Sequence, residues 1–144
     1  MDRIDDCISF LSGKAAQAVA RVTRERLAPH GVTPVQYAVL QVLWERDGQS
    51  GAAIGSRLVL DSATVTGVLD RLEKQSLIVR AAASGDRRVH RILLTPAGKA
   101  CREPLQAAMD AINADIGRQL GADAPALASL LRKLAAVTTG LTEG

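Results

Sequence analysis

Aromatic side chains are nearly absent from this 144-residue chain, in which Phe10, Tyr37 and Trp44 are the only three. Proteins that bind single-stranded nucleic acid stack the bases on aromatic rings, so this scarcity argues against that class of ligand. Apolar residues still make up 47% of the chain, enough for a core that must be built from Ala, Leu, Val and Ile. Such a core is typical of packed helices, and the length suits a single domain or one tightly integrated unit.

Cysteine and histidine are too few to build a disulfide framework or a zinc site. The chain has only Cys7 and Cys101, and its two histidines, His30 and His90, lie far apart without ligand spacing. No Ser-His-Asp or Cys-His set, phosphate-binding loop or pair of carboxylates stands out as a catalytic site. We therefore expect a protein that is not an enzyme and that carries no metal and no cofactor.

A long apolar run is also missing. No stretch approaches the roughly 18 apolar residues of a membrane span. The acidic start of the chain, MDRIDD, lacks the basic region of a signal peptide. We therefore expect a cytoplasmic protein that has no membrane partner.

Positive charge is concentrated in one segment of the sequence. The formal net charge of the whole chain is only +3. Residues 50–95 hold seven basic and four acidic side chains, so the entire excess lies there and the remainder of the chain is neutral. A local excess of this kind is the electrostatic footprint of a segment that meets DNA phosphates.

The apolar pattern from Ser62 to about Gln75 predicts an amphipathic helix. At 100° per residue, one side collects four apolar residues, Val65, Val68, Leu69 and Leu72. The opposite face is small and polar near its N-terminus, which would let the backbone approach base edges in a DNA groove. An ordinary amphipathic helix with a solvated face is the alternative. The candidates for DNA contact on this helix are Ser62, Ala63, Thr64, Thr66, Gly67, Arg71 and Lys74.

Gly67 favours the DNA-binding interpretation of that helix. A glycine inside a helix costs about 1 kcal/mol relative to alanine, so its presence calls for a reason. Close approach of another molecule to the helix backbone would supply one.

The residues after this helix predict a basic β-hairpin. Apolar runs at 77–79 and 92–94 flank a small, polar, glycine-containing tip at 83–86. A helix followed by such a hairpin is the second half of a winged helix-turn-helix, in which the helix lies in a DNA groove. A solvated basic turn is the alternative. The arginines of this segment are Arg80, Arg87, Arg88 and Arg91, and only Asp86 opposes them.

Arginine suits a narrow, electronegative minor groove, so the hairpin joins the candidate DNA-binding surface. Asp86 is able to cap the turn or to pair with Arg87 or Arg88, which would fix the tip. The candidates for DNA contact here are Asp86, Arg87 and Arg88.

Helix starts are clearly marked along the rest of the chain. Thr33 and Gln36 predict a capping box around Pro34, which would occupy the first helical position. Pro104 lies inside the helix that follows the hairpin and should kink or interrupt it. The other predicted starts are Ser50 for a helix over 51–58, Asp61 or Ser62 for the recognition helix, and Thr95-Pro96 for the next helix.

Both ends of the chain carry long apolar stripes on predicted helices. The first helix should run from about Arg3 to Ala28, with apolar residues at alternating spacings of 4 and 3. Such a helix needs a partner, either in its own domain or in a second copy of the chain, and we favour a partly intermolecular contact. The stripes comprise Ile4, Ile8, Leu11, Ala15, Ala18 and Val22, then Leu105, Met109, Ile112, Ile116 and Leu120, then Leu127, Leu130, Leu131, Leu134, Val137 and Leu141.

Three blocks of the sequence resemble the MarR family of bacterial transcription regulators. They are VTPVQYAVLQVLW at 32–44, LVLDSATVTGVLDRLEKQSLIVR at 58–80 and GDRRVHRILLTPAG at 85–98, and together they cover about the central half of the chain. The second and third blocks are quite specific, and the third carries Asp-Arg-Arg, an apolar strand and Leu-Thr-x-x-Gly in the order of the family's wing.

The resemblance implies a mainly α fold with a small β-hairpin wing. A winged helix-turn-helix at 32–98 would be flanked by dimerisation helices at 1–31 and 99–144, in one integrated domain. It also implies a homodimer that binds a palindromic double-stranded DNA operator and is associated with the bacterial nucleoid. Each recognition helix would lie in a major groove and each wing at a minor groove.

Many members of the family are repressors released by small phenolic or aromatic acids, so we expect a dimeric repressor of that kind. The family's ligand pocket lies between the dimer helices and the winged domain. A carboxylate ligand would want Arg or His beside an apolar wall. Each candidate also fits an ordinary structural or surface role. The candidates for ligand contact are Ser9, Phe10, Lys14, Arg21, His30 and Tyr37.

Two alternatives to this function stay open. Cys7 lies roughly where family members that sense organic hydroperoxides carry their reactive cysteine, which would make the protein an oxidant-sensing repressor. That branch uses tyrosines around the sulfur, whereas Pro34 stands at one such position here and the first helix has none, so Cys7 fits a small helical hydrophobe better. The second alternative, a winged-helix module that binds protein, is disfavoured by the charge concentrated in the wing.

Overall fold

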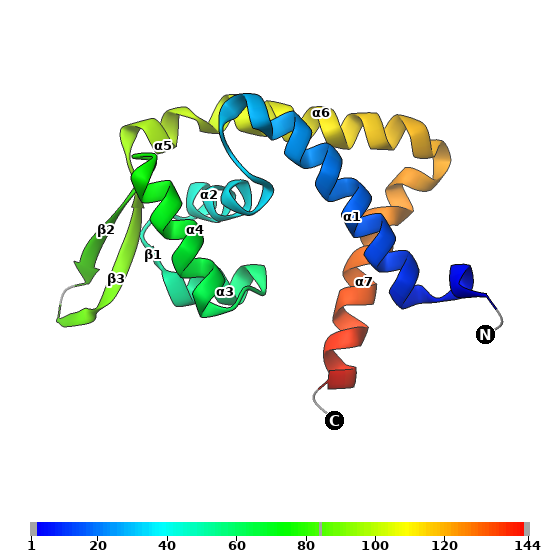
Figure 1. The fold of residues 1–144 in the computed structure, drawn as a ribbon, viewed down its shortest axis with the longest axis horizontal. Coiled ribbons are helices and arrows are strands. Elements are labelled where there is room, and N and C mark those ends of the chain that lie inside the picture. The colour runs from blue at the N-terminus through cyan, green and yellow to red at the C-terminus, as the bar shows by residue number, and fades with distance from the viewer. Residues whose placement is uncertain (1–2, 84, 143–144) are drawn as a thin grey trace. The chain divides into compact units, whose positions relative to one another are not determined.

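The computed structural model describes residues 3–83 and 85–142, without the side chains of Asp86, Arg87 and Thr142. The described chain is mostly helical, with a three-stranded antiparallel sheet in the order β1-β3-β2 (Figure 1). This arrangement confirms the predicted fold class. The chain divides into two compact units, Met1–Ala108 and Met109–Gly144.

The first unit contains the winged helix-turn-helix, and α6 begins in it and ends in the second unit. Its elements are a 3-10 turn at Ile4–Asp6, α1 (Ile8–Leu27), a 3-10 turn at Ala28–His30, α2 (Pro34–Glu45), β1 (Gln49–Ser50), α3 (Gly51–Leu58), α4 (Ser62–Lys74), β2 (Ile78–Ala83), β3 (Asp86–Leu94) and α5 (Pro96–Ala100). The remaining elements are α6 (Arg102–Leu120), a 3-10 turn at Gly121–Asp123 and α7 (Ala124–Thr142).

The helix starts of the first unit follow the capping residues. The predicted capping box at α2 is confirmed, because Gln36 N donates to Thr33 Oγ1 at 3.3 Å and Thr33 N donates to Gln36 Oε1 at 2.9 Å. Asp61, and not Ser62, caps α4. The side chains of Ser50 and Thr95 cap α3 and α5, as predicted.

The first helix is shorter than predicted at its start. Cys7 has an extended backbone, with φ −82° and ψ 114°, so a 3-10 turn and α1 replace one continuous helix from Arg3. Asp5 and Asp6 occupy the turn, and aspartate is a poor residue for a helix interior. Cys7 N donates to Ile4 O at 3.0 Å, which closes the turn before α1 begins.

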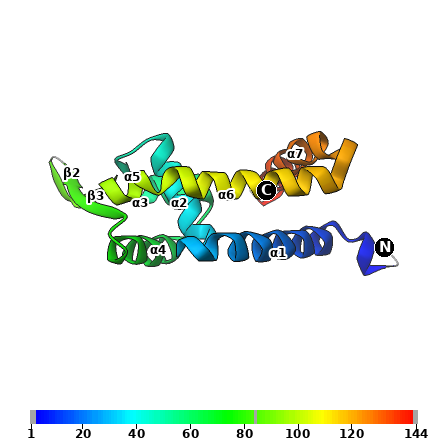
Figure 2. The same cartoon turned by 90° about the horizontal axis from the view of Figure 1, so that it is seen from above.

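The hairpin strands are longer than predicted, since β2 extends to Ala83 and β3 begins at Asp86. Alanine has little intrinsic preference for strands, so residues 81–83 gave no strand signal. They are ordered by pairing with β3 in a ladder that runs from Ile78 opposite Leu94 to a bulge at Ala82 and Ala83. Both views show this hairpin projecting away from α3 and α4 (Figures 1 and 2).

The interruption predicted at Pro104 lies three residues earlier. Cys101 separates α5 from α6, and Pro104 stands in the first turn of α6. The N–H groups of a first turn have no partner within the helix, so a proline there removes no hydrogen bond.

An aliphatic core holds the winged unit together. Trp44 is half-buried on α2, and its Nε1 donates a hydrogen bond to the Gly98 carbonyl oxygen at 2.8 Å. Gly98 is required at that point, since an added Cβ would lie 2.0 Å from the Leu77 carbonyl oxygen. The buried apolar residues of this unit are Leu27, Val32, Val39, Leu40, Val42, Leu43, Ile54, Val65, Val68, Leu69, Leu72, Ile78, Ile92, Leu94 and Leu105.

The apolar stripes of α1 and α7 are largely exposed, whereas Leu105 and Ile112 of the α6 stripe are buried. On α1, only Thr23 and Leu27 are buried, whereas Ile8 is 67% exposed. On α7, Leu130 is 61% exposed and Leu131 55% exposed. Rows of exposed aliphatic residues along a helix are typical of a surface that another protein chain covers.

Among the described residues, no single helix is both long enough and apolar enough to cross a membrane, and α3 and α4 meet those criteria only as a pair bent by 115°.

Candidate DNA-binding surface

The helix-turn-helix is formed by α3, the turn at residues 59–61, and α4. Gly55 lets the two helices approach closely, because an added Cβ would lie 2.9 Å from Val65 Cγ2. Leu60 N donates to Gly55 O at 2.9 Å and closes the end of α3. Val59 adopts a left-handed conformation in the turn, with φ 55° and ψ 48°. This is an uncommon and strained backbone for a β-branched residue.

α4 is amphipathic in the way its sequence predicts. Val65, Val68, Leu69 and Leu72 are all buried. The outward face carries the predicted contact residues, and only Gly67 among them is half-exposed. The exposed ones are Ser62, Ala63, Thr64, Thr66, Arg71 and Lys74.

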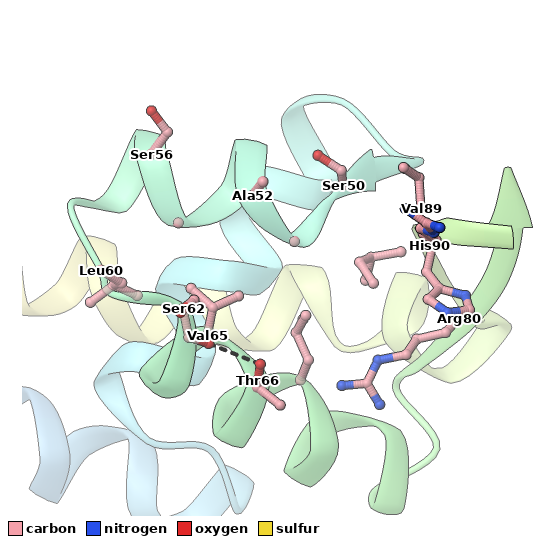
Figure 3. A pocket seen from close by; sticks show the side chains of 15 residues that line it. Ser50, Ala52, Ser56, Leu60, Ser62, Val65, Thr66, Arg80, Val89 and His90 are labelled. Carbon is pink, nitrogen blue, oxygen red and sulfur yellow. Dashed lines mark hydrogen bonds between the residues drawn. The ribbon is translucent and has the colours of Figure 1, made fainter. Parts of the chain in front are cut away.

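The N-terminal turn of α4 has a defined hydrogen-bonding pattern. Thr64 N donates to Asp61 Oδ1 at 2.7 Å, and this backbone hydrogen bond holds the pKa of the Asp61 carboxyl below its ordinary value. Thr66 Oγ1 donates to the Ser62 carbonyl oxygen at 2.8 Å (Figure 3). The Thr66 hydroxyl hydrogen is therefore used inside the helix, and its oxygen remains able to accept a hydrogen bond from outside.

Among the residues that the structure describes, none packs against Gly67. An added Cβ would meet nothing within 4 Å, in contrast to Gly55 and Gly98. Alanine would fit this position among the described residues, so their packing does not require the glycine.

A hollow of about 550 Å³ separates α3 and α4 from the wing (Figure 3). Its walls contain aliphatic side chains, hydroxyls and basic groups. The lining residues of α4 are Ser62, Val65, Thr66 and Leu69, and those of the wing are Arg80, Arg88, Val89, His90 and Ile92. The small polar face of α4 and the basic strand β3 thus border one concave surface.

The arginines of the wing are not equivalent. Arg80 Nη2 lies 2.7 Å from Asp70 Oδ1, and Arg80 Nη1 lies 3.0 Å from Glu73 Oε1. The expectation that only Asp86 opposes the wing arginines is therefore wrong, because two carboxylates of α4 neutralise Arg80. Asp70 and Glu73 lie three positions apart and share one side of a helix, but nothing in that spacing indicates that Arg80 reaches them.

Arg88 and Arg91 are exposed on β3. The side chains of Asp86 and Arg87 lie outside the described part of the structure. The predicted capping or pairing by Asp86 therefore stays a prediction.

The six candidate ligand residues are distributed over three segments. Ser9, Phe10, Lys14 and Arg21 are exposed on α1, and His30 is exposed in the following 3-10 turn. Lys14 Nζ lies 5.8 Å from the centre of the Phe10 ring, a cation–π contact on one face of α1.

Tyr37, the sixth candidate, is half-buried on α2. Its ring meets that of Trp44 edge-on at 5.9 Å, and its hydroxyl donates to Gln41 Oε1 at 3.3 Å. None of the six candidates lines the hollow between α4 and the wing.

Comparison with known proteins agrees with this geometry. The model of the MarR family matches residues 32–90. The HTH-type transcriptional regulator TtmR of Methylorubrum extorquens (strain PA1) is 39% identical over 134 residues, which cover 93% of this chain and 67% of that protein. The organic hydroperoxide resistance transcriptional regulator of Bacillus subtilis (strain 168) is 31% identical over 134 residues, covering 92% of this chain and 89% of that protein.

This chain belongs to the MarR family. Its relatives and its fold are those of transcriptional regulators and not of enzymes, so it is a DNA-binding transcriptional regulator.

Two solved structures of MarR-like regulators are similar over nearly the whole chain. The transcriptional repressor CouR bound to a 23-mer DNA duplex has a TM-score of 0.84 and 27% identity, covering 96% of each chain. The second structure is that of Bordetella bronchiseptica BpsR, whose DNA binding is regulated by 6-hydroxynicotinic acid. It has a TM-score of 0.85 and 25% identity, and covers 94% of this chain and 97% of that one.

Proposed function

We propose that this MarR-family chain is a dimeric, sequence-specific repressor that a small aromatic or phenolic acid releases from a palindromic operator. The proposal that the protein binds DNA rests on the concave surface shared by the small polar face of α4 and the basic strand β3. The similar fold of CouR on a DNA duplex supports it. The protein would act in the cytoplasm, at the nucleoid.

The two sides of this surface meet different parts of the duplex. α4 enters the major groove, where Thr64 and Thr66 reach base edges or nearby phosphates, and the missing side chain of Gly67 lets the helix come close. Arg88, with Asp86 and Arg87 near the tip, meets the minor groove or its phosphates. Arg71 and Lys74, exposed toward the end of α4, add phosphate contacts.

Homodimer formation would cover the exposed apolar stripes of the chain ends. Ile8 on α1 and Leu130 on α7 are more than half exposed in one chain, and a second copy would bury such surfaces on both. A dimer with two-fold symmetry also explains a palindromic operator, because each half-site meets one winged unit. Replacing Leu130 and Leu134 with Glu should dissociate or unfold the dimer, and a monomeric wild type at micromolar concentration by light scattering would contradict it.

The effector class rests on family evidence and on the chemistry of α1. The regulator of DNA binding in BpsR, 6-hydroxynicotinic acid, is an aromatic acid. Phe10 and Lys14 together offer an aromatic face and a cation on one helix, and Arg21 and His30 lie further along the same segment. Ser9 and Tyr37 complete the proposed ligand set. An aromatic carboxylate suits a cation beside an apolar wall.

Oxidant sensing through Cys7 is the second candidate, favoured by the similarity to the hydroperoxide resistance regulator of B. subtilis. Cys7 is half-buried where the 3-10 turn meets α1. Burial raises the pKa of the Cys101 thiol, which disfavours the reactive thiolate there. If Cys7 is structural, Cys7→Ser should leave DNA affinity and its insensitivity to peroxide unchanged.

One experiment tests the proposal as a whole. The purified protein selects duplexes from a random-sequence library, and fluorescence anisotropy then measures its affinity for the selected duplex and for a scrambled one. We expect a selected palindrome, and weaker binding when one member of a panel of benzoic, hydroxybenzoic and hydroxycinnamic acids is added. Loss of binding with peroxide alone, abolished by Cys7→Ser, would replace the acid effector by the oxidant.

A further inference from the structure

One side chain of the wing, Arg80, forms ion pairs with the recognition helix. It extends from β2 toward α4 (Figure 3), where its two terminal nitrogens contact different carboxylates, those of Asp70 and Glu73. The Arg80 side chain is 24% exposed, less than either partner. A planar guanidinium that makes two bonds in fixed directions defines an orientation as well as a distance.

The position of Arg80 in the sheet makes this contact important. Arg80 pairs with Ile92 in the ladder, and Ile92 also pairs with Gln49 of β1. β1 pairs with β3 only at Arg91 and Ile92, so the sheet has three strands at the level of Arg80. Further out the hairpin is a two-stranded ribbon, and such ribbons twist more readily than wider sheets.

Packing does little to restrain the outer part of β2. Ile78 is its only buried residue, and the positions beyond Arg80 are Ala81, Ala82 and Ala83. None of these three alanines lines the hollow beside α4. On the β2 edge, Arg80 is therefore the last contact with α4 before the ribbon projects.

We infer that Arg80, held by Asp70 and Glu73, is a positioning residue that sets the angle between the wing and α4 and so matches them to two neighbouring grooves of one DNA site. This inference rests on the proposed use of the wing against DNA. Arg80 itself does not serve as a phosphate contact, because its charge is already neutralised by two carboxylates.

Neutral variants of the two acids separate this role from simple electrostatics. Glu73→Gln, alone or with Asp70→Asn, removes negative charge beside the DNA-binding surface, which by charge alone would tighten binding to every duplex. A released wing has the opposite effect on specific binding. For the double variant we expect a loss of about tenfold or more on the selected duplex, the size of a lost specific contact, and little change on the scrambled one.

Glu45→Gln is the matched control for Glu73→Gln. Glu45 also pairs with one arginine, Arg57, at 2.7 Å, but this exposed pair joins α2 to α3 and does not involve the wing. The control should bind both duplexes like the wild type. Equal effects of Glu45→Gln and Glu73→Gln, or tighter binding by the double variant, would overturn the inference.

Arg80→Lys provides a second test, because it keeps the positive charge and loses the two-pronged contact. We expect it to resemble the double variant on the selected duplex. Wild-type affinity for that duplex would overturn the inference, since charge alone would then be sufficient.

A measurement without DNA tests the angle directly. Spin labels at Ala52 on α3 and Val89 on β3, in a chain with Cys7 and Cys101 replaced and diluted with unlabelled protein, report the distance across the hollow by pulsed electron paramagnetic resonance. We expect a broader distribution in Asp70→Asn/Glu73→Gln and in Arg80→Lys than in the parent and Glu45→Gln. An unchanged distribution would refute the positioning role. If the wild type selects no DNA, the proposed function fails while this measurement still decides the role of Arg80.

Discussion

The side-chain amide of Gln36 donates a hydrogen bond to the side-chain oxygen of Gln75 at 3.1 Å, and so joins the start of α2 to the end of the recognition helix. Gln36 is buried, and its own oxygen accepts from Thr33 N in the capping box. Gln75 in turn donates to the Gly31 carbonyl oxygen at 2.8 Å. The end of α4 is therefore fixed to the junction between α1 and α2 on one side and to the wing, through Arg80, on the other.

Gln36→Leu should destabilise the protein by about 1–3 kcal/mol, because it removes the hydrogen bonds to Thr33 N and Gln75, each of which contributes about 0.5–1.5 kcal/mol, while the side-chain volume is kept. Gln75→Ala should cost about 1–3 kcal/mol, because it removes two hydrogen bonds that each contribute about 0.5–1.5 kcal/mol. Urea unfolding of both single variants and the double variant measures their coupling. Strictly additive losses would show that the two amides do not act together.

Gly67→Ala should have opposite effects on stability and on DNA binding. The folded chain has room for the methyl group, so the helix should gain up to about 1 kcal/mol of stability. The same methyl would hold α4 away from the major groove and weaken binding to the selected duplex. Urea unfolding and fluorescence anisotropy measure the two effects.

Gly117→Ala is the matched control, since that helical glycine on α6 also has open space around its Cα. It should stabilise the protein and leave DNA affinity unchanged. Wild-type DNA affinity in Gly67→Ala would remove the argument that α4 approaches the groove closely.

The stability that Asp61 gives to α4 should depend on pH in a defined direction. The hydrogen bond from Thr64 N–H holds the pKa of Asp61 below its ordinary value of 3.8. Because the folded-state pKa is the lower one, this contribution is fully present above about pH 3.8 and disappears as the pH falls through the folded-state value. Asp61→Ala should therefore lower Tm at pH 7, and its difference from the wild type should shrink below pH 3.8.

Asp110→Ala is the comparison for that pH series, since it removes an exposed carboxylate from the interior of α6, where no helix is capped. Differential scanning calorimetry from pH 7 downward measures Tm for all three proteins. A gap between Asp61→Ala and the wild type that stays constant with pH would exclude the carboxylate as the capping group.

Arg88→Ala and Thr66→Ala should weaken DNA binding in different ways. Loss of Arg88 should reduce affinity for all sequences and lower the salt dependence by about one released counterion per site. Loss of Thr66 should weaken the selected duplex more than a scrambled one, by roughly 1 kcal/mol or more per half-site. Anisotropy at several salt concentrations distinguishes them, and a silent Arg88→Ala would show that the wing does not contact DNA.

Local chemistry explains why much of the fold was predictable. A capping residue acts on a backbone N–H two or three positions away, so the starts of α2, α3 and α5 could be read directly. The buried side of α4 followed from helical periodicity. Sequence could not decide between Asp61 and Ser62 as the cap of α4, because both residue types fit and only the backbone conformation distinguishes them.

Contacts between distant residues could not be predicted in this way. Arg80 meets Asp70 and Glu73 only because the chain reverses after α4, and the contact removes one arginine from the apparent charge of the wing. The three alanines of β2 gave no strand signal, because their conformation depends on pairing with β3. The need for glycine at position 98 and the Gln36–Gln75 hydrogen bond both depend on residues that are distant in the sequence. No single segment of the sequence therefore indicates them.

The hydrogen bond from Trp44 to Gly98 gives this regulator an intrinsic optical reporter. Trp44 is the only tryptophan, and all three aromatic residues precede position 109, so the unit Met109–Gly144 has no aromatic fluorescence or absorption of its own. Tryptophan emission should follow the melting of the winged unit alone, whereas far-ultraviolet circular dichroism follows helices in both units. The gap between the two melting curves, or its absence, would show whether the two units lose structure in one cooperative event.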